Sequence, residues 1–315
     1  MITRHFVITT IFPLVLSFVG PRAIAQQSAA VQGVPVNMVV GVEPKHGDEI
    51  PTIMQQDMMV YQGHDREPVT NWVPAKGNRA GLALAILIDD SAGLSLGTQI
   101  NDIRTFIGQQ APTTLVAVGY MHNGTVGLAQ NFTQDHMAAA KSLRLAQGFS
   151  GVDDSPYLSI SDLIKRWPSN DAIHRREILA ITSGIDSVYM GSFPNPYTDT
   201  AVQDAQCGGV LVYSIYMPSA GHFGHSYYRS YWGQNYLSEL SEMTGGESYY
   251  LLGPQAPVAF APYLNRLNRQ LANQFLLTFL AKPQKKAEIE SVKLTSEIHS
   301  VDFVHAQRVC VPASQ

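Results

Sequence analysis

The hydrophobic pattern of this chain is dominated by one unbroken apolar run, Leu82–Ile88, which stops at Asp89-Asp90-Ser91. The run is too short to span a membrane and has no polar alternation, so it predicts a strand buried on both faces. A helix is predicted next, because apolar residues recur at helical spacing at Leu96, Ile100, Ile103 and Ile107. Two carboxylates and a hydroxyl therefore lie at the carboxyl end of a buried strand, where open α/β sheets bind ligands.

Strand and helix patterns continue to alternate after this unit. Further strands are predicted at 114–120, 125–130, 177–181, 209–217 and 245–251. Helices are predicted at 94–109, 134–145, 157–167, 200–206, 235–243 and 257–271. The tight turn at His122-Asn123-Gly124 makes its two flanking strands an antiparallel hairpin. The alternation as a whole predicts a mostly parallel sheet that helices cover.

Both ends of the mature chain are β-rich instead. We expect an N-terminal β element at 35–77, an α/β domain at 78–272 and a C-terminal β extension at 273–312. The first element contains strand patterns at 36–42, 58–61 and 69–73, and the extension contains them at 274–280, 289–294 and 307–311. The late strands are expected either to flank the main sheet or to pair with the N-terminal β element.

The first residues have the pattern of a secretory signal peptide, which we place at 1–25. A basic start at Arg4-His5 precedes the apolar run Phe6–Val19, and Ala23-Ile24-Ala25 has the small-residue pattern of a cleavage site. The alternative is a membrane anchor, which the short apolar run disfavours. A flexible lead follows at 26–34, and no later segment is long and apolar enough to span a bilayer. We therefore expect an exported protein, periplasmic or extracellular.

Composition limits the function classes further. The chain has 315 residues, with 45% hydrophobic and 15% charged residues, which allows a sizeable core. Its net charge of −4 argues against nucleic-acid binding, which requires a basic surface.

The chain has two cysteines, Cys207 and Cys310. In an oxidising compartment they are a candidate disulfide, although two separate buried thiols remain the alternative.

Four segments, in this order and spacing, resemble the von Willebrand factor type A (VWA) domain. They are Met54–Tyr61 before the domain, Leu84–Ser91 as its first strand, Ile178–Gly184 as its fourth, and Thr244–Tyr250 before its last strand. The chain is most similar to the exported bacterial subfamily known as acidobacterial VWFA-related domains, over most of its mature length. The resemblance implies a doubly wound, mostly parallel six-stranded sheet with one antiparallel edge strand and helices on both faces.

The resemblance also implies a metal-ion-dependent adhesion site at the carboxyl edge of the sheet. Such a site holds Mg²⁺ or a similar cation with a carboxylate, hydroxyls and waters, and leaves one position for an acidic group of a partner. Asp89, Ser91 and Ser155 match the pattern of the family. Gly93 and Ser183 stand where the family has a second hydroxyl and a late aspartate. Because little charge remains to offset dehydration of the ion, we expect a degenerate site without tight metal binding.

Other carboxylates lie close in sequence to the same edge, at Asp90, Asp153, Asp154 and Asp186. They either compensate for the lost ligands or are ordinary solvated loop residues, and we favour the second interpretation. Asp90, Asp154 and Asp186, together with Ser183, are candidate contacts with a protein partner.

A second candidate surface is the aromatic segment 221–236, which is expected to be a loop. It contains the histidine pair His222 and His225, followed by Trp232 among several tyrosines. Three interpretations are open: a partner contact, local packing against the sheet, or a zinc site, for which the segment offers no third ligand.

No nucleophile elbow, phosphate-binding glycine loop or Cys-x-x-Cys motif is present in the sequence. We therefore expect a non-enzymatic, exported binding module of the bacterial envelope that contacts an unidentified protein. One alternative is a structural envelope component with no surviving site. The other is a hydrolase that uses the polar sheet edge or the pair His222 and His225.

Overall fold

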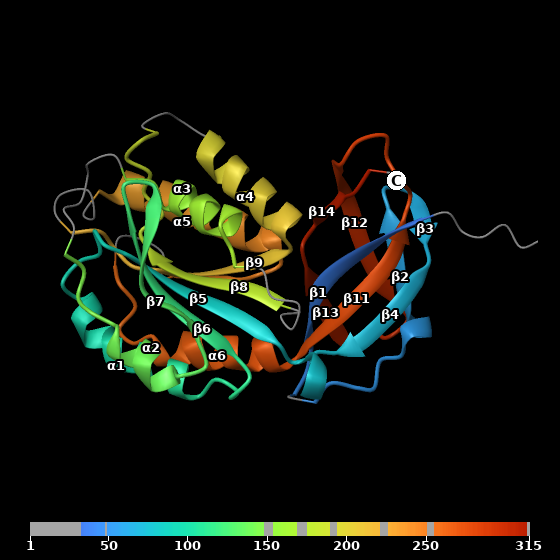
Figure 1. Cartoon of the computed structure of the whole chain (residues 1–315), viewed down its shortest axis with the longest axis horizontal. Helices are drawn as coiled ribbons and strands as arrows, with labels where there is room; N and C mark the ends of the chain where they lie inside the picture. The colour runs from blue at the N-terminus through green and yellow to red at the C-terminus, as the bar shows by residue number, and fades with distance from the viewer. Residues whose placement is uncertain are drawn as a thin grey trace, which may run out of the picture. The chain divides into compact units, whose positions relative to one another are not determined.

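The computed structural model describes residues 33–47, 49–147, 154–168, 175–189, 194–220, 226–250 and 255–313. Residues 32–315 form one compact unit, in which a six-stranded sheet and two four-stranded sheets occur (Figure 1). The signal peptide expected at 1–25 lies outside the described residues. Within the described part, no helix combines the length and apolar character needed to cross a membrane.

The six-stranded sheet has the strand order β10-β9-β8-β5-β6-β7. Its strands are β5 (Leu82–Asp89), β6 (Leu115–His122), β7 (Thr125–Thr133), β8 (Arg175–Thr182), β9 (Val210–Tyr216) and β10 (Ser248–Tyr249). All neighbours are parallel except β6 and β7, which form the predicted hairpin at the edge. The apolar run of β5 is buried along its whole length, as expected for a central strand with helices on both faces.

Two layers of helices cover this sheet. The helices are α1 (Leu96–Gly108), α2 (His136–Lys141), α3 (Pro156–Lys165), α4 (Pro196–Gly208), α5 (Tyr227–Thr244) and α6 (Ala261–Ala272). Residues of α1, α2 and α6 share one hydrophobic core with one face of the sheet, and residues of α3, α4 and α5 share a second core with the other face (Figure 1). The prediction of a doubly wound, mostly parallel six-stranded sheet with one antiparallel edge strand is confirmed.

The β-rich ends of the chain form two sheets with a common core. One sheet has the order β13-β1-β11-β4 and the other β14-β12-β2-β3. Their strands are β1 (Val34–Pro44), β2 (Met58–Gln62), β3 (Asp65–Glu67), β4 (Val69–Pro74), β11 (Gln274–Ala281), β12 (Glu288–Ser296), β13 (Val301–His305) and β14 (Arg308–Val311). Two short 3₁₀ turns, Gln55–Asp57 and Gly77–Arg79, flank β2 and β5. Side chains of both sheets meet in one hydrophobic cluster, as in a β-sandwich.

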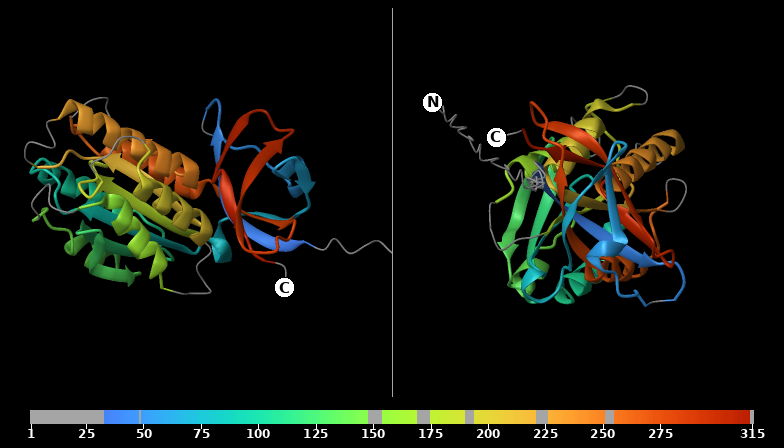
Figure 2. Two further views of the ribbon diagram at one scale, coloured as in Figure 1. Left: turned by 90° about the horizontal axis from the view of Figure 1, so that it is seen from above. Right: turned by 90° about the vertical axis from the view of Figure 1, so that its right-hand side faces the viewer.

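N-terminal and C-terminal strands therefore pair with each other (Figure 2). Strand β1 is antiparallel to β11 and β13, and β2 is antiparallel to β12. Of the two arrangements that the sequence left open, this is pairing with the N-terminal β element. Strand β1 begins at Val34, within the segment expected to be a flexible lead. Two short strands, β3 and β13, have no counterpart among the predicted strands.

The aromatic segment before residue 236 differs from its expected structure. We expected a loop at 221–236, but α5 begins at Tyr227, so the described aromatic residues lie on a helix. The helix starts there because the Ser226 hydroxyl accepts a hydrogen bond from the backbone N–H of Arg229 as an N-cap. Tyr228, Trp232 and Tyr236 recur every four residues, and this helical spacing was the available signal. Residues His222 and His225 lie outside the described residues.

Candidate functional site

Asp89 is the centre of a buried hydrogen-bond group at the carboxyl edge of the main sheet. Its Oδ1 accepts hydrogen bonds from the backbone N–H and the hydroxyl of Ser91, at 2.9 and 2.6 Å. Its Oδ2 accepts a hydrogen bond of 2.7 Å from the Thr182 hydroxyl. Asp89 ends β5 and Thr182 ends the neighbouring parallel strand β8, which is why the two side chains meet. The group thus offers one carboxylate and two hydroxyl oxygens, each of which keeps a lone pair when it donates.

Thr182 was not among the residues that the sequence analysis selected. It begins the Thr-Ser-Gly segment that we compared with the Thr-Asp-Gly end of the VWA domain's fourth strand. A hydroxyl at the end of a strand adjacent to β5 was the available signal, because the carboxyl ends of parallel strands meet at one edge.

Ser155 belongs to a different hydrogen-bond group, centred on Asp186. The Oδ2 of Asp186 accepts hydrogen bonds from the Ser155 hydroxyl at 2.8 Å and from the Asn195 amide at 3.0 Å. Its Oδ1 accepts from the backbone N–H groups of Val188 and Tyr189, both at 2.9 Å. Ser155 and Asn195 are also the N-caps of α3 and α4. Asp186 therefore fastens two helix starts and a loop, and its carboxylate is fully engaged within the chain.

Asp154 lies buried beside these two groups. Its Oδ1 accepts no hydrogen bond from the described residues. Burial, the negative charge of Asp89 and that of Asp186 raise the pKa of Asp154 to about 7. A carboxyl group in that state carries only part of a negative charge at neutral pH. The carboxylates that the sequence places near this edge are thus not equivalent.

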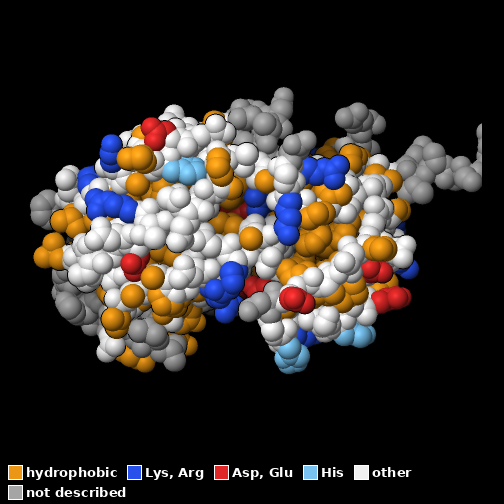
Figure 3. All heavy atoms as spheres, turned by 90° about the horizontal axis from the view of Figure 1, so that it is seen from below, with side chains coloured by type: hydrophobic (Ala, Val, Ile, Leu, Met, Phe, Trp, Pro, Cys, Tyr) orange, Lys and Arg blue, Asp and Glu red, His pale blue; other side chains and the backbone are white. Residues whose placement is uncertain are grey.

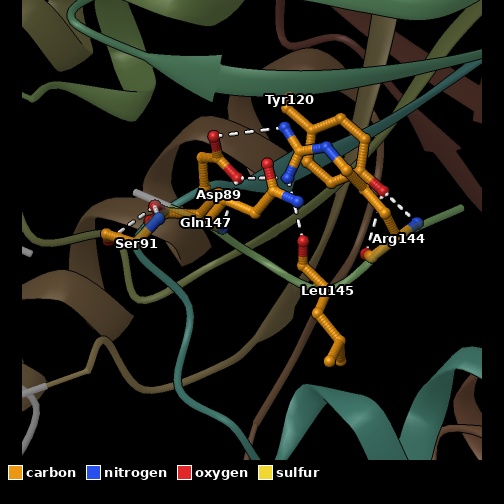
Figure 4. A network of polar contacts seen from close by, with 7 residues as sticks. Asp89, Ser91, Tyr120, Arg144, Leu145 and Gln147 are labelled. Atoms are coloured by element: carbon orange, nitrogen blue, oxygen red, sulfur yellow. Dashed lines mark hydrogen bonds and ion pairs between the residues drawn. The ribbon is translucent and has the colours of Figure 1, made fainter. Parts of the chain in front are cut away.

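Asp90 pairs with Arg144, from the segment after α2. The Arg144 guanidinium bonds both carboxylate oxygens of Asp90, at 2.7 and 3.2 Å, and the Gln147 N–H donates to Oδ1 at 2.9 Å. Figure 4 shows the Arg144 side chain along the Tyr120 ring, where its guanidinium carbon is 3.7 Å from the ring centroid. Burial raises the pKa of Asp90, but the hydrogen bonds from Arg144 and Gln147 outweigh it and leave the pKa below its ordinary value. Asp90 therefore holds the segment that follows α2.

The chain segment after β9 packs along the first loop of the site. The N–H of Gly93 donates to the carbonyl of Pro218 at 3.0 Å, and the Ala220 N–H donates to the carbonyl of Ser91 at 2.8 Å. A Cβ atom on Gly93 would lie 3.3 Å from the Pro218 oxygen, so a serine there requires this segment to shift. Ser183 is buried, and its hydroxyl accepts a 2.7 Å hydrogen bond from Ser219.

Both positions that depart from the VWA pattern thus contact the same segment, 218–219. Among the described residues, no group of three or more histidine, cysteine, aspartate or glutamate side chains is placed to hold a metal ion.

An aromatic cavity of about 170 Å³ adjoins this edge. It is lined by residues 184–186 and by Tyr189, Tyr228, Arg229, Trp232, Gly233 and Tyr236. The ring of Trp232 stacks on Tyr236 with centroids 6.0 Å apart, and Tyr228 meets Trp232 edge-on at 5.9 Å. The wall formed by α5 is therefore aromatic, while the opposite wall comes from the loop that follows β8.

Two glycines allow α5 to approach that loop. A Cβ atom on Gly233 would lie 2.2 Å from the carbonyl oxygen of Ser183, and one on Gly184 would lie 2.4 Å from the carbonyl oxygen of Gly233. Gly184 also has a positive φ of 66°, which side chains disfavour. This close approach places the aromatic residues of α5 beside the Asp186 loop.

The cysteines lie far from this edge and are joined. Cys207, in the last turn of α4, forms a disulfide with Cys310 of β14, with their Cα atoms 4.8 Å apart. The bond links the α/β sheet layer to the sandwich across 103 residues of sequence. Of the two alternatives for the cysteines, the structure has the bonded one.

Comparison with known proteins gives structural likenesses only. No protein-family model and no curated protein matches the chain. An aerotolerance-related membrane protein from Bacteroides fragilis is similar at 13% identity and a TM-score of 0.43, over 61% of this chain and 98% of that one. The VWA domain of SpRpn10 is similar at 12% identity and a TM-score of 0.38, over 58% and 94%. The pilus adhesin SpaC from Lactobacillus rhamnosus GG is similar at 10% identity and a TM-score of 0.38, over 82% and 47%.

These likenesses are distant, and the acidobacterial subfamily stays a prediction. The strand order, the antiparallel edge strand and the two helix layers are properties of this chain itself. The α/β part of the chain thus has the sheet order and the two helix layers that the resemblance to the von Willebrand factor type A domain implies.

Proposed function

We propose that this chain is an exported, non-enzymatic VWA-type module that binds a protein partner through the carboxyl edge of its main sheet, and that its metal site is degenerate. One observation carries the proposal: the segment 218–219 packs against both Gly93 and Ser183. A side chain at position 93 would press on the Pro218 carbonyl, and the Ser183 hydroxyl is already engaged by Ser219. The edge is therefore suited to direct contact with a partner.

The donor set around Asp89 fits Mg²⁺ poorly. Magnesium favours an octahedron of oxygen ligands with enough negative charge to offset its dehydration. Asp89 supplies one carboxylate, while Ser91 and Thr182 supply neutral hydroxyls. In the part of the chain that the structure describes, no group of three or more histidine, cysteine, aspartate or glutamate side chains is placed to hold a metal ion. These features support a site without tight metal binding.

The aromatic cavity beside the edge is the part of this surface best suited to a partner side chain. Tyrosine and tryptophan contribute large contact areas to protein interfaces at little conformational cost. Tyr228 is 65% exposed and lines the cavity, so its ring is available to a partner. We place the contact surface on this cavity and the adjoining loop 184–186.

Export is supported by two independent features. The pattern of residues 1–25 is that of a signal peptide. The disulfide between Cys207 and Cys310 suits an oxidising compartment, either the periplasm or the outside of the cell.

A nucleic-acid partner is not part of the proposal, since the chain has a net charge of −4. On the face drawn in Figure 3, the described basic and acidic side chains are interspersed and hydrophobic ones lie between them.

The partner contact is tested by capture with a matched pair of tyrosine variants. Tyr227 and Tyr228 are neighbours on α5 with 68% and 65% exposure, but of the two only Tyr228 lines the cavity. We expect wild type and Tyr227→Ala to retain the same protein from envelope and secreted fractions, and Tyr228→Ala to retain much less of it. Equal retention by all three proteins would contradict the contact surface. A wild type that retains nothing would favour the alternative of a purely structural envelope component.

The metal proposal is tested by calorimetric titration of the mature chain with Mg²⁺ and Mn²⁺. We expect no saturable heat at concentrations up to about 1 mM, where weak extracellular cation sites are filled. Asp89→Asn, which keeps the shape of the side chain and removes its charge, is expected to behave identically. Saturable binding by the wild type that this variant abolishes would show a working metal site.

The hydrolase alternative is addressed by a double variant. His222→Ala/His225→Ala is expected to leave any hydrolytic signal of the preparation unchanged. A specific activity that disappears with both histidines would replace the binding-module proposal with an enzymatic one.

A further inference from the structure

A cavity of about 580 Å³ lies at the opposite, amino edge of the main sheet, next to the β-sandwich. One wall is the outer face of β1 and β11, and the other includes Arg79, Arg176 and the end of α4 with its disulfide. Cavities that bind small organic molecules have volumes of about 300 to 1,000 Å³ and lie preferentially between structural layers or domains. This cavity has that size and that position.

The charge of the cavity differs from that of the chain. No aspartate or glutamate is among the described residues that line it, although the chain as a whole has a net charge of −4. Arg79 and Arg176 provide two positive charges. Within the described part of the chain, neither guanidinium forms an ion pair. Two arginines without ion pairs therefore line a cavity whose described lining has no acidic residue.

The neighbouring Arg175 brings these two residues together. Its Nη2 donates to the carbonyl of Ala80 at 2.8 Å, and its backbone N–H donates to the carbonyl of Gly81 at 3.1 Å. These bonds hold the turn that carries Arg79 against the start of β8. Because successive side chains of a strand point to opposite faces, Arg176 faces away from the buried Arg175 and lines the cavity.

A row of polar side chains completes the site on the sandwich wall. In register, Thr278 of β11 lies opposite Asn37 of β1 and opposite Asn71 of β4, so the three form one row across three strands. All three line the cavity, and the Thr278 hydroxyl donates to the Asn37 side-chain oxygen at 2.7 Å. On the same face of β1, Val39 is packed into the core of the main sheet. Val39 and Leu276 also line the cavity, so its sandwich wall is polar along the row and apolar beside it.

We propose that this cavity binds a small organic anion that carries two carboxylate groups or a phosphate ester on a hydrogen-bonding body. Guanidinium groups recognise carboxylate and phosphate by paired, charge-assisted hydrogen bonds. The amides and hydroxyl of the row provide both donors and acceptors for hydroxyl groups on the ligand. The site lies at the amino edge of the sheet, so it is separate from the partner contact proposed for the carboxyl edge.

The test is a ligand titration of the mature, disulfide-bonded chain by thermal unfolding and calorimetry. The probes are succinate and citrate as carboxylates, glucose 6-phosphate as a phosphate ester, inorganic phosphate, and glucose as a neutral control. We expect saturable binding of at least one organic anion with a Kd below about 1 mM, as for ordinary small-molecule sites. Which of the two anion classes binds identifies the charged group that the cavity recognises.

Matched arginine variants assign the binding to this cavity. Arg79→Gln and Arg176→Gln are each expected to weaken binding about tenfold, the loss typical of one charge-assisted hydrogen bond. Arg66→Gln makes the same charge change at an exposed residue of β3 outside the cavity and is expected to bind as wild type does. The proposal is overturned if none of the organic anions binds, or if Arg66→Gln weakens binding as much as the two cavity variants. Equal affinity for inorganic phosphate and glucose 6-phosphate would overturn the role of the polar row.

Discussion

The buried carboxyl group of Glu177 is expected to make the stability of this protein fall as pH rises. Glu177 lies in β8 within the main sheet, is fully buried, and has Arg175 nearby. Burial raises the pKa of Glu177 from 4.5 to about 7, although the positive charge of Arg175 acts in the opposite direction. The folded protein therefore holds this proton more tightly than the unfolded chain does.

The sign and size of the effect follow from linkage. Below pH 4.5 the Glu177 carboxyl is protonated in both the folded and the unfolded state, so it does not change the free energy of unfolding. As pH rises from 4.5 through about 7, the carboxyl ionises more readily in the unfolded chain, so the folded state loses stability. A rise of about 2.5 pKa units, at 1.36 kcal/mol per unit, corresponds to about 3 kcal/mol above pH 7. This value is an upper bound for Glu177→Gln, because the substitution also removes the charge that faces Arg175. The Arg175 guanidinium keeps hydrogen bonds to Leu271, Gln274 and Ala80.

The assay is urea unfolding of wild type and Glu177→Gln at pH 5, 6, 7 and 8 at constant ionic strength. We expect similar free energies of unfolding near pH 5 and a variant that is more stable by up to about 3 kcal/mol near pH 8. Asp154 titrates in the same range, but it is present in both proteins and cancels in their difference. Glu242→Gln, at an exposed position of α5, is the charge-matched control. A difference between wild type and Glu177→Gln that does not change with pH would refute the reasoning.

Three further substitutions test the packing around the site and the disulfide. Gly233→Ala is expected to destabilise the protein by about 3 kcal/mol in chemical unfolding, because its Cβ atom would lie 2.2 Å from a backbone oxygen and force α5 away. Thr182→Val is expected to cost about 2 kcal/mol by the same measurement, since it removes the donor to a buried oxygen of Asp89. Removing the disulfide with Cys207→Ser/Cys310→Ser is expected to cost about 4 kcal/mol, because the bond closes a loop of 103 residues.

Each substitution has a control within the chain. Gly108→Ala lies at the end of α1 with no atom within 4 Å of its new Cβ, so it is expected to be neutral or slightly stabilising. Thr52→Val changes an exposed threonine and is expected to have little effect. The cysteine variant is compared with the wild type under reducing conditions, where the two should be equally stable. Losses in the controls as large as those in the variants would show that local packing is not the cause.

The sequence identified the main sheet because its signals are local. The uninterrupted apolar run of β5, the helical spacing in α1 and the short turn between β6 and β7 each lie within about twenty residues, so periodicity detects them. Asp89 and Ser91 follow directly on the apolar run in the sequence, and they lie at the end of the buried strand as predicted. It did not find Thr182, because their hydrogen bond joins residues 93 positions apart in the sequence.

The aromatic segment shows where a local signal misleads. Tyrosine, tryptophan and glycine between 227 and 236 indicate a loop by propensity, yet they form the first turns of α5. Tertiary contact overrides that propensity, since Gly233 allows the helix to touch the Ser183 backbone and its aromatic residues to pack together.

By itself, the sequence determined the alternation of strands and helices, the buried central strand, and the carboxylate and hydroxyl at its end. The tertiary structure alone decided which distant segments meet. Residues far apart in the chain meet in four places: where β1 pairs with β11, where segment 218–219 packs on the site, at the disulfide, and where Arg79 and Arg176 line one cavity. Such contacts depend on how the packed layers fit together, and the periodicity of a single segment carries no information about its distant neighbours.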